Sequence, residues 1–344
     1  MKIFLAGYRH KPLEEFLLNE VYARRKEKGM RRLLSYIRIQ KSNDLETQDI
    51  LQNYLDRHVE IFLDSGAYSV FKSRQVVSLD SYIKFIHRFG KYFSTYANLD
   101  VIGDVKGTLR NQKEMEKQGL VPLPCFHSGE PLKYLHYYID NYPYFALGGV
   151  AGKLKGADAI SSWLDQIFSW VGDKTKVHGF GITSVKLMLR YPWFSVDSTS
   201  WLKLGGCGKV YVAKPWSPSP GAYAIIGVSA RSPTQKRVGV HLSTFPANQR
   251  QYILDYFKEK GIPLGHSDFK TEDVDYILKK NECWLSEEKN GEREVEVRGE
   301  LGLCNDYRVR QLMCMLFFLD LEEKMKPWPW TYETKSESTG FGLK

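Results

Sequence analysis

Acidic side chains follow three apolar runs of this sequence, in each case where the run ends. Asp197 follows the largely aromatic and β-branched residues 193–196, Asp64 follows residues 61–63, and Asp100 ends a third run. A carboxylate at the end of a buried strand costs free energy unless it is paired or takes part in chemistry. Converging carboxylates can act as nucleophile and general acid or base. The alternative is a cap or a turn, which explains one such residue easily and three together poorly.

The segments that would position these carboxylates alternate between strand-like and helix-like composition. This alternation predicts parallel strands joined by right-handed crossovers. Parallel strands end at one edge of a sheet, so the strand-end carboxylates would converge on one mouth. The predicted strands are Lys2–Gly7, Glu60–Asp64, Phe93–Asp100, Val121–His127, Tyr144–Gly149, Lys176–Ile182, Trp193–Asp197 and Lys209–Ala213.

Eight strand–helix units predict an α/β fold, a (β/α)₈ TIM barrel over residues 1–215. An open doubly wound sheet is the alternative. No Gly-x-Gly-x-x-Gly follows the first strand, so a dinucleotide site is not expected. After the proline-rich segment 215–220, residues 216–344 are predicted to form a C-terminal α+β addition of short strands, helices and a polar tail. Within it, Asn290-Gly291 has the sequence of a tight hairpin turn.

The composition points to a globular protein with an acidic partner. Of the 344 residues 43% are hydrophobic, and the net charge of +9 favours a partner such as nucleic acid. The N-terminal apolar run is too short for a signal peptide, and no apolar run approaches a membrane span. Five scattered cysteines fit a reducing compartment. We therefore expect a cytoplasmic protein without membrane contact.

Basic side chains cluster in the first long connection, at Arg24, Arg25, Lys28, Arg31 and Arg32. One interpretation is a phosphate-contacting edge beside the barrel mouth, which would bind a nucleic acid. The other is the solvated face of a helix.

Four motifs resemble those of the tRNA-guanine transglycosylases, in the order in which that family carries them. They are Asp64-Ser65-Gly66-Ala67-Tyr68-Ser69, Leu147-Gly148-Gly149-Val150-Ala151-Gly152, His178-Gly179-Phe180-Gly181-Ile182 and Ser195-Val196-Asp197-Ser198. The sequence is most similar to the branch in phages and bacterial genomic islands, the DNA 7-deazaguanine transglycosylases. The resemblance implies a (β/α)₈ enzyme that exchanges a guanine in a polynucleotide for a 7-deazaguanine, in the host cytoplasm if the protein is phage-encoded.

The resemblance also implies roles for the strand-end residues. Asp197 would be the nucleophile that forms a covalent intermediate with the sugar, and Asp64 the general acid/base. Asp100, or Asp104 as second choice, would accept hydrogen bonds from the guanine edge, although either could instead cap a helix. The remaining predicted base-binding residues are Ser65, Tyr68, Gly148, Gly149 and His178.

For several of these residues a structural explanation competes with the functional one. Tyr68 could stack on the base or pack as a core aromatic. Gly148 and Gly149 could admit the base edge or form a plain turn. His127 and Glu130 also lie at a strand end, and their roles stay open, as does the role of His178 at the mouth.

The chain departs from the tRNA enzymes in its cysteines. Those enzymes carry Cys-x-Cys-x-x-Cys with a later histidine after the barrel, whereas Cys283, Cys304 and Cys314 are widely spaced. We expect no structural zinc and no cofactor for the chemistry. Losing this element argues for a nucleic acid other than tRNA.

The expected function is therefore the exchange of guanine in DNA for a 7-deazaguanine base, which is the co-substrate. The same chemistry on tRNA is the first alternative. A catalytically silent barrel that binds nucleic acid and an unrelated barrel glycosidase are the others. A duplex substrate would have to flip the target nucleotide out of the stack.

Overall fold

The computed structural model describes residues 1–7, 11–73, 77–149, 156–214, 222–231, 237–285 and 287–332. The proline-rich segment 215–220 and most of the predicted polar tail lie outside them. The chain divides into two compact units. The first contains residues 1–199 and the chain from Glu322 onward, and the second is Ser200–Leu321.

The first unit is built on an eight-stranded parallel sheet with the order β4-β3-β2-β1-β8-β7-β6-β5. Its strands are β1 (Lys2–Ala6), β2 (Met30–Ser35), β3 (Val59–Asp64), β4 (Thr95–Tyr96), β5 (Cys125–His127), β6 (Tyr144–Gly148), β7 (Lys176–Gly179) and β8 (Ser195–Ser198). The predicted parallel α/β architecture is confirmed at this level.

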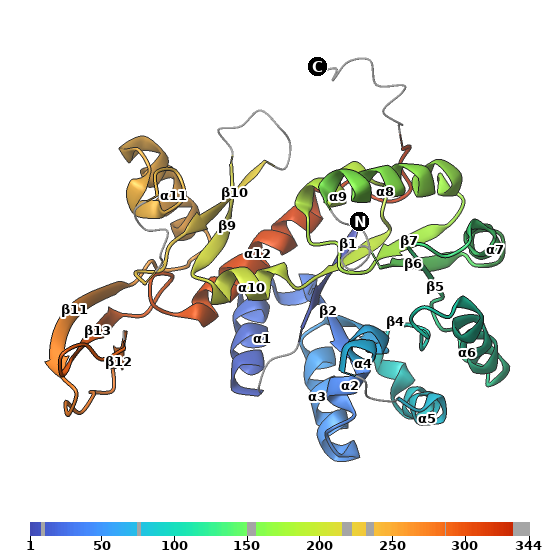
Figure 1. Ribbon diagram of the computed structural model, residues 1–344, viewed down its shortest axis with the longest axis horizontal. Coiled ribbons are helices and arrows are strands. Elements are labelled where there is room, and N and C mark those ends of the chain that lie inside the picture. Colours follow the sequence, from blue (N-terminus) through green and yellow to red (C-terminus); the bar gives the residue numbers. More distant parts are fainter. Residues whose placement is uncertain are drawn as a thin grey trace. The chain divides into compact units, whose positions relative to one another are not determined.

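Helices connect successive strands and lie around the outside of the sheet (Figure 1). Local sequence defines several of their ends. The helix α3 (Asp44–Asp56), which precedes β3, begins after Asn43, whose side chain and that of Glu46 form a reciprocal capping box. The helices are α1 (Lys11–Arg25), η1 (Lys26–Lys28), α2 (Tyr36–Ile39), α3 (Asp44–Asp56), α4 (Ala67–Ser73), α5 (Leu79–Phe89), η2 (Gly90–Tyr92), α6 (Val105–Lys117), α7 (Leu132–Asn141), α8 (Ala157–Val171) and α9 (Val185–Arg190).

The sheet is curled, as contacts between side chains of non-adjacent strands on its inner face show. The ring of Phe62 on β3 lies 4.6 Å from that of His178 on β7 and 5.4 Å from that of Phe4 on β1, measured between centroids. Small and apolar residues complete this core, namely Ala6, Leu33, Ala97, Leu123, Cys125 and Ala146. Next to the two edge strands, the Leu123 N–H donates to the carbonyl of Tyr96 (2.8 Å), and the Asn98 N–H donates to that of Leu123 (2.9 Å).

Two strands differ from the prediction. Met30–Ser35 was expected to belong to a basic connection but forms β2, in the middle of the sheet. Lys209–Ala213 was predicted as the eighth parallel strand, and this is wrong, since it forms β9 and pairs antiparallel with β10 (Tyr223–Gly227). The prediction missed β2 because Arg31 and Arg32 are charged, which is unusual for a central strand. It misplaced β9 because a strand-like composition does not indicate which other strand it pairs with.

The second unit combines antiparallel strands with helices. Beyond β9 and β10 it contains α10 (Ser200–Gly206), η3 (Leu242–Thr244), α11 (Ala247–Glu259), β11 (His266–Asp273), β12 (Glu282–Trp284), β13 (Glu292–Glu300) and most of α12 (Tyr307–Lys324). The last three strands form a sheet of order β11-β13-β12. Asn290 and Gly291 have φ of +55° and +82°, as the predicted hairpin turn requires.

The apolar helix α12 organises the core of the second unit. Arg310 donates from Nε to the carbonyl of Gly205 (2.8 Å), and the Gln311 amide donates to that of Leu202 (3.0 Å). Phe317 stacks on Tyr211 of β9. In the part of the chain that the structure describes, no helix is both long and apolar enough to cross a membrane.

Candidate active site

Asp64 is the last residue of β3 and lies beside Ser35, the last residue of β2. Its carboxylate accepts hydrogen bonds from the Ser35 side chain and the Gly66 N–H. Gly66 has φ of +79°, and a Cβ there would lie 2.2 Å from Ile37, so glycine is required for this turn. Burial, and next to it the negative charge of Asp197, raise the pKa of Asp64 to about 6. Both the protonated and the ionised form of Asp64 are therefore populated near neutral pH.

Asp197 lies on β8, two strands away from β2 in the sheet order, and pairs in register with Phe4 of β1. It is only 6% exposed. The Gly181 N–H donates to its Oδ1 (2.8 Å), and Nε2 of His178 lies 3.5 Å from the same oxygen. These two contacts orient the carboxylate. Because the charge of Asp197 acts on Asp64, the two carboxylates lie within electrostatic reach of each other.

A chain of polar side chains continues from Asp197 through the buried His178 and Ser195 to the partly buried Tyr144. His178 Nδ1 lies 2.6 Å from the Ser195 hydroxyl, which lies 2.6 Å from the Tyr144 hydroxyl. Burial lowers the pKa of His178, so that its imidazole is neutral at neutral pH. A carboxylate only accepts, so the neutral ring places its proton on Nε2 toward Asp197. Ser195 then donates to Nδ1, and Tyr144 donates to Ser195.

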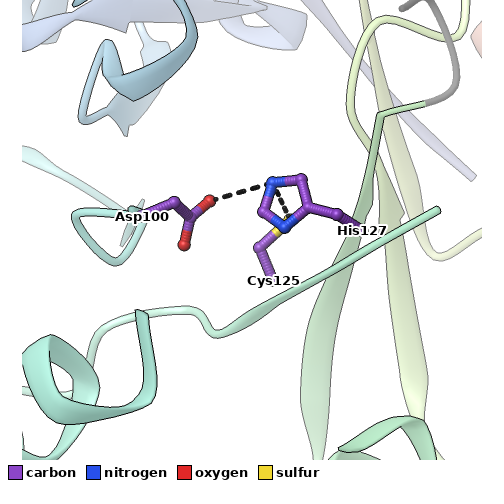
Figure 2. Close-up of side chains that lie close together, drawn as sticks. All are labelled: Asp100, Cys125 and His127. Atoms are coloured by element: carbon purple, nitrogen blue, oxygen red, sulfur yellow. Dashed lines mark hydrogen bonds and ion pairs between the residues drawn. The ribbon is translucent and has the colours of Figure 1, made fainter. Parts of the chain in front are cut away.

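A second group of polar side chains comes from the segment after β4 and from β5, where Asp100, Cys125 and His127 lie close together (Figure 2). His127 Nε2 lies 3.4 Å from Asp100 Oδ2 and 3.6 Å from Cys125 Sγ. On the other side of the ring, His127 Nδ1 lies 3.3 Å from Glu130 Oε1. The pKa of Asp100 is raised to about 7, mainly by burial. The negative charges of Glu130 and Asp64 also raise this pKa, whereas His127 lowers it. Asp100 therefore lies within electrostatic reach of Asp64.

The structure separates the two candidates for the base edge. Asp104 is the N-cap of α6, where its Oδ1 accepts from the Gly107 N–H (2.9 Å) and its Oδ2 lies 3.5 Å from Arg110. The alternative interpretation as a helix cap therefore accounts for Asp104. Asp100, in contrast, is nearly buried and grouped with Cys125 and His127.

The other predicted base-binding residues lie around the same strand ends. Ser65 is buried directly after Asp64, whereas Tyr68 on α4 is 48% exposed. Gly149 has φ of +77° after β6. Gly148 is packed, since a Cβ there would lie 2.8 Å from His127 Nε2 and 2.9 Å from Cys125 Sγ. The space at Gly148 is thus used by those two side chains.

The basic cluster does not lie at the mouth. Met30 at the start of β2 pairs with Val59 at the start of β3, so Arg24 to Arg32 lie toward the amino ends of the strands, opposite Asp64. Arg32 is fully buried and ion-paired with Glu14 (2.6 Å). The prediction that Arg32 contacts phosphate is therefore wrong. The other four are ion-paired to acidic partners: Arg24 with Glu20, Arg25 and Lys28 with Glu323, and Arg31 with Glu60 and Glu322.

Sequence reasoning missed Ser195 and Tyr144 and did not group Cys125 with His127. The signal was present for two of them. Residues two apart on a strand point to the same face, so Ser195 shares a face with Asp197, and Cys125 shares one with His127. Tyr144 carries no comparable signal, because it reaches Ser195 across the interior of the curled sheet.

No protein-family model matches the chain, and no curated protein sequence matches it.

Proposed function

We propose that this protein is a base-exchange glycosyltransferase that replaces guanine in DNA with a 7-deazaguanine base. The observation that carries the proposal is a pair of carboxylates, the buried Asp197 and the half-buried Asp64, on separate strands but within reach of each other's charge. Exchange of a base with retention at the sugar needs two carboxylates in different protonation states, one to attack and one to transfer a proton.

The fold is proposed to be a closed (β/α)₈ barrel with the site at its carboxyl mouth. The two hydrogen bonds between Tyr96, Leu123 and Asn98 support closure, because they join the segments next to the edge strands β4 and β5. The contact between Phe62 and His178 across the inner face supports it as well. In such a barrel the ends of β3 and β8 share one mouth.

In the first step, a carboxylate oxygen of Asp197 attacks the anomeric carbon of the target deoxyguanosine. The bond from that carbon to the base breaks, and Asp64 donates its proton to the departing guanine. In the second step, the ionised Asp64 takes a proton from the incoming 7-deazaguanine. The freed nitrogen of that base attacks the same carbon and displaces Asp197, which restores both carboxyl groups to their starting states.

His178, Ser195 and Tyr144 would hold Asp197 during this cycle. Nε2 of His178 and the Gly181 N–H both face Oδ1 of Asp197, which leaves Oδ2 for the attack. The nucleophilic oxygen is therefore expected to be the one without these contacts.

DNA is proposed as the polynucleotide from the net charge of +9 and from the motif resemblance to the DNA branch. The test incubates the full chain with a radiolabelled 7-deazaguanine base and either duplex DNA, single-stranded DNA or tRNA. Label in DNA supports the proposal. Label in tRNA alone would keep the chemistry and change the substrate, and no label in any of them would count against both.

The nucleophile is tested by Asp197→Asn and Asp197→Ala, with Asp56→Asn on α3 as a matched exposed control. We expect both changes at residue 197 to abolish label incorporation and the covalent protein–DNA adduct, seen by mass spectrometry of denatured protein. The Asp56 variant should retain both. Turnover by Asp197→Ala would remove Asp197 as the nucleophile.

A further inference from the structure

The side chains of Asp100, Cys125 and His127 offer three ligand atoms of different kinds that all lie within 4.8 Å of one another (Figure 2). Cys125 and His127 share one face of β5, and the fold brings Asp100, from the segment after β4, to them. We propose that they bind one divalent transition-metal ion, with Zn²⁺ as the preferred ion. The site does not depend on the glycosyl transfer proposed above.

The two distances from His127 Nε2 to the other ligand atoms match the edges of a tetrahedral site. Zinc bonds to nitrogen and oxygen are about 2.0–2.2 Å long and those to sulfur about 2.3 Å. At a tetrahedral angle, nitrogen and oxygen ligands are then roughly 3.4 Å apart, and sulfur and nitrogen ligands roughly 3.6 Å. His127 Nε2 lies 3.4 Å from Asp100 Oδ2 and 3.6 Å from Cys125 Sγ.

Glu130 supplies the outer contact that a metal-binding histidine usually has. Its Oε1 lies 3.3 Å from His127 Nδ1, and its Oε2 accepts from the backbone N–H of His127 (3.0 Å). A carboxylate on Nδ1 places the proton there and leaves the lone pair of Nε2 for the metal. This contact involves none of the three ligand atoms, and it independently favours metal binding through Nε2 of His127.

The backbone of β6 makes room for the ligands. A Cβ at Gly148 would approach His127 Nε2 to 2.8 Å and Cys125 Sγ to 2.9 Å, both too close. Any other residue at this position would displace two of the three ligand atoms. The glycine therefore has a role in shaping the group.

The exposure of the three residues favours a site with an open position. The Cys125 residue is 1% exposed, whereas the side chains of Asp100 and His127 are 9% and 15% exposed. Three protein ligands with a fourth position for water or substrate is the arrangement of catalytic rather than structural zinc sites. Asp100 would then hold the ion, and the open position would take a nitrogen or oxygen donor of a ligand.

The same atoms could instead form a cysteine–histidine nucleophile pair. The burial of Cys125 disfavours this, because an electrophilic carbon has to reach the sulfur in line. Alkylation of the metal-free protein separates the two uses. Fast iodoacetamide labelling of Cys125 that Zn²⁺ does not prevent would assign the thiol as a nucleophile and overturn the metal site.

The direct test strips the full chain with a chelator, dialyses it against Zn²⁺ and measures bound metal by mass spectrometry. We expect one equivalent per chain. Loading with Co²⁺ should give the visible bands of a tetrahedral ion and a near-ultraviolet thiolate-to-cobalt band. Cys125→Ser should lose the thiolate band, and Cys207→Ser, at an exposed cysteine, should keep it. A chain that retains no ion, or an unchanged band in Cys125→Ser, would refute the site.

A second variant keeps the test decisive if Cys125→Ser fails to fold. Glu130→Gln is conservative and leaves all three ligand atoms in place, so circular dichroism should be unchanged. Loss of an outer contact to a ligating histidine typically weakens metal binding by about 10–100-fold. An unchanged affinity in Glu130→Gln, together with unchanged binding in Asp100→Asn, would contradict the proposal. None of these readouts uses glycosyl transfer, so this site and the proposed function can fail separately.

Discussion

Asp64 and Asp197 are identical side chains in different surroundings, and this difference is what the proposed chemistry needs. Asp64 is desolvated and feels the charge of Asp197, which raises the pKa of Asp64 to about 6. Asp197 is instead held by the Gly181 N–H and faced by His178. Two carboxyl groups whose environments differ in this way can divide the work of acid and nucleophile.

The raised pKa of Asp64 predicts a pH dependence for the first half-reaction. Only protonated Asp64 can donate to the departing guanine, so the rate of adduct formation should fall as the pH rises above about 6. The fall should approach tenfold per pH unit. Rapid quenching followed by mass spectrometry of the adduct measures it. Asp64→Asn should lower the rate by about 10²–10⁴-fold and remove this dependence.

The same shift predicts an effect on stability. A carboxyl whose folded pKa is raised binds protons more tightly when folded, so the protein loses stability between about pH 4 and pH 6 and the full penalty remains above that range. Asp64→Asn removes the penalty and should raise the free energy of unfolding at pH 7 by about 1–3 kcal/mol. The gain should vanish near pH 4. Urea unfolding at both values checks this, and a variant that is less stable at pH 7 would contradict it.

The hydrogen-bonded chain from Asp197 to Tyr144 predicts graded effects. Ser195→Ala leaves Nδ1 of His178 without a donor inside the core, which costs about 1–3 kcal/mol. Tyr144→Phe removes only the outermost hydrogen bond and should cost about 0.5–1.5 kcal/mol. We expect turnover to fall more in Ser195→Ala than in Tyr144→Phe, without a change in DNA affinity. Tyr22→Phe, at an exposed tyrosine, is the control.

Among the elements, β2 shows how a central strand can contain a charge. Arg32 donates to the carbonyls of Leu5 (2.7 Å) and Gly7 (2.6 Å) and pairs with Glu14 of α1, which also accepts from Tyr54 of α3. One buried ion pair thus ties β1 and β2 to α1 and α3. The pair belongs to the sheet and leaves the guanidinium no access to a nucleic acid.

Breaking this pair should destabilise the protein strongly. Arg32→Ala leaves Glu14 as a buried, unpaired charge, and losses of this kind are about 3–5 kcal/mol. Arg24→Ala, which removes a pair at spacing i, i+4 with Glu20 on the surface of α1, should change stability by less than about 0.5 kcal/mol. Chemical denaturation of both variants measures the difference. Equal effects would mean that the buried pair does not support the sheet.

For the whole molecule, the orientation of the parallel sheet decides where a polynucleotide would react in the proposed function. The candidate site lies at the carboxyl ends of the strands, while Arg24, Arg25 and Lys28 precede β2 at the amino ends. These three side chains are also ion-paired, Arg24 with Glu20 and both Arg25 and Lys28 with Glu323. A DNA bound at the mouth would therefore be held by other cations.

This arrangement predicts the salt dependence of DNA binding. The affinity of the intact chain should fall steeply with salt, because bound phosphates release counterions. Neutralising Arg24, Arg25 and Lys28 together should leave the slope of log affinity against log salt unchanged. Fluorescence anisotropy over a salt series measures the slope. If the magnitude of this slope decreased by about one for each residue neutralised, these side chains would have to contact the nucleic acid.

Short-range patterns were enough to predict much of this protein. The alternation of apolar strands and amphipathic helices indicated a parallel α/β unit, and strand ends that contain Asp-Ser predicted Asp64 and Asp197 as candidate site residues. The Asn290-Gly291 turn and the alternative assignment of Asp104 as a helix cap also follow from local preferences, since a turn or a cap is completed within a few residues.

Other features depend on partners distant in the chain. Arg32 can lie in a central strand because Glu14 meets it there, and β9 leaves the parallel sheet because β10 pairs with it. Likewise, the approach of Asp100 to Cys125 and His127 needs the register of neighbouring strands and the curl of the sheet. Local sequence encodes backbone preference and the face that is buried, but strand pairing and charge compensation are settled by the packing of the complete chain.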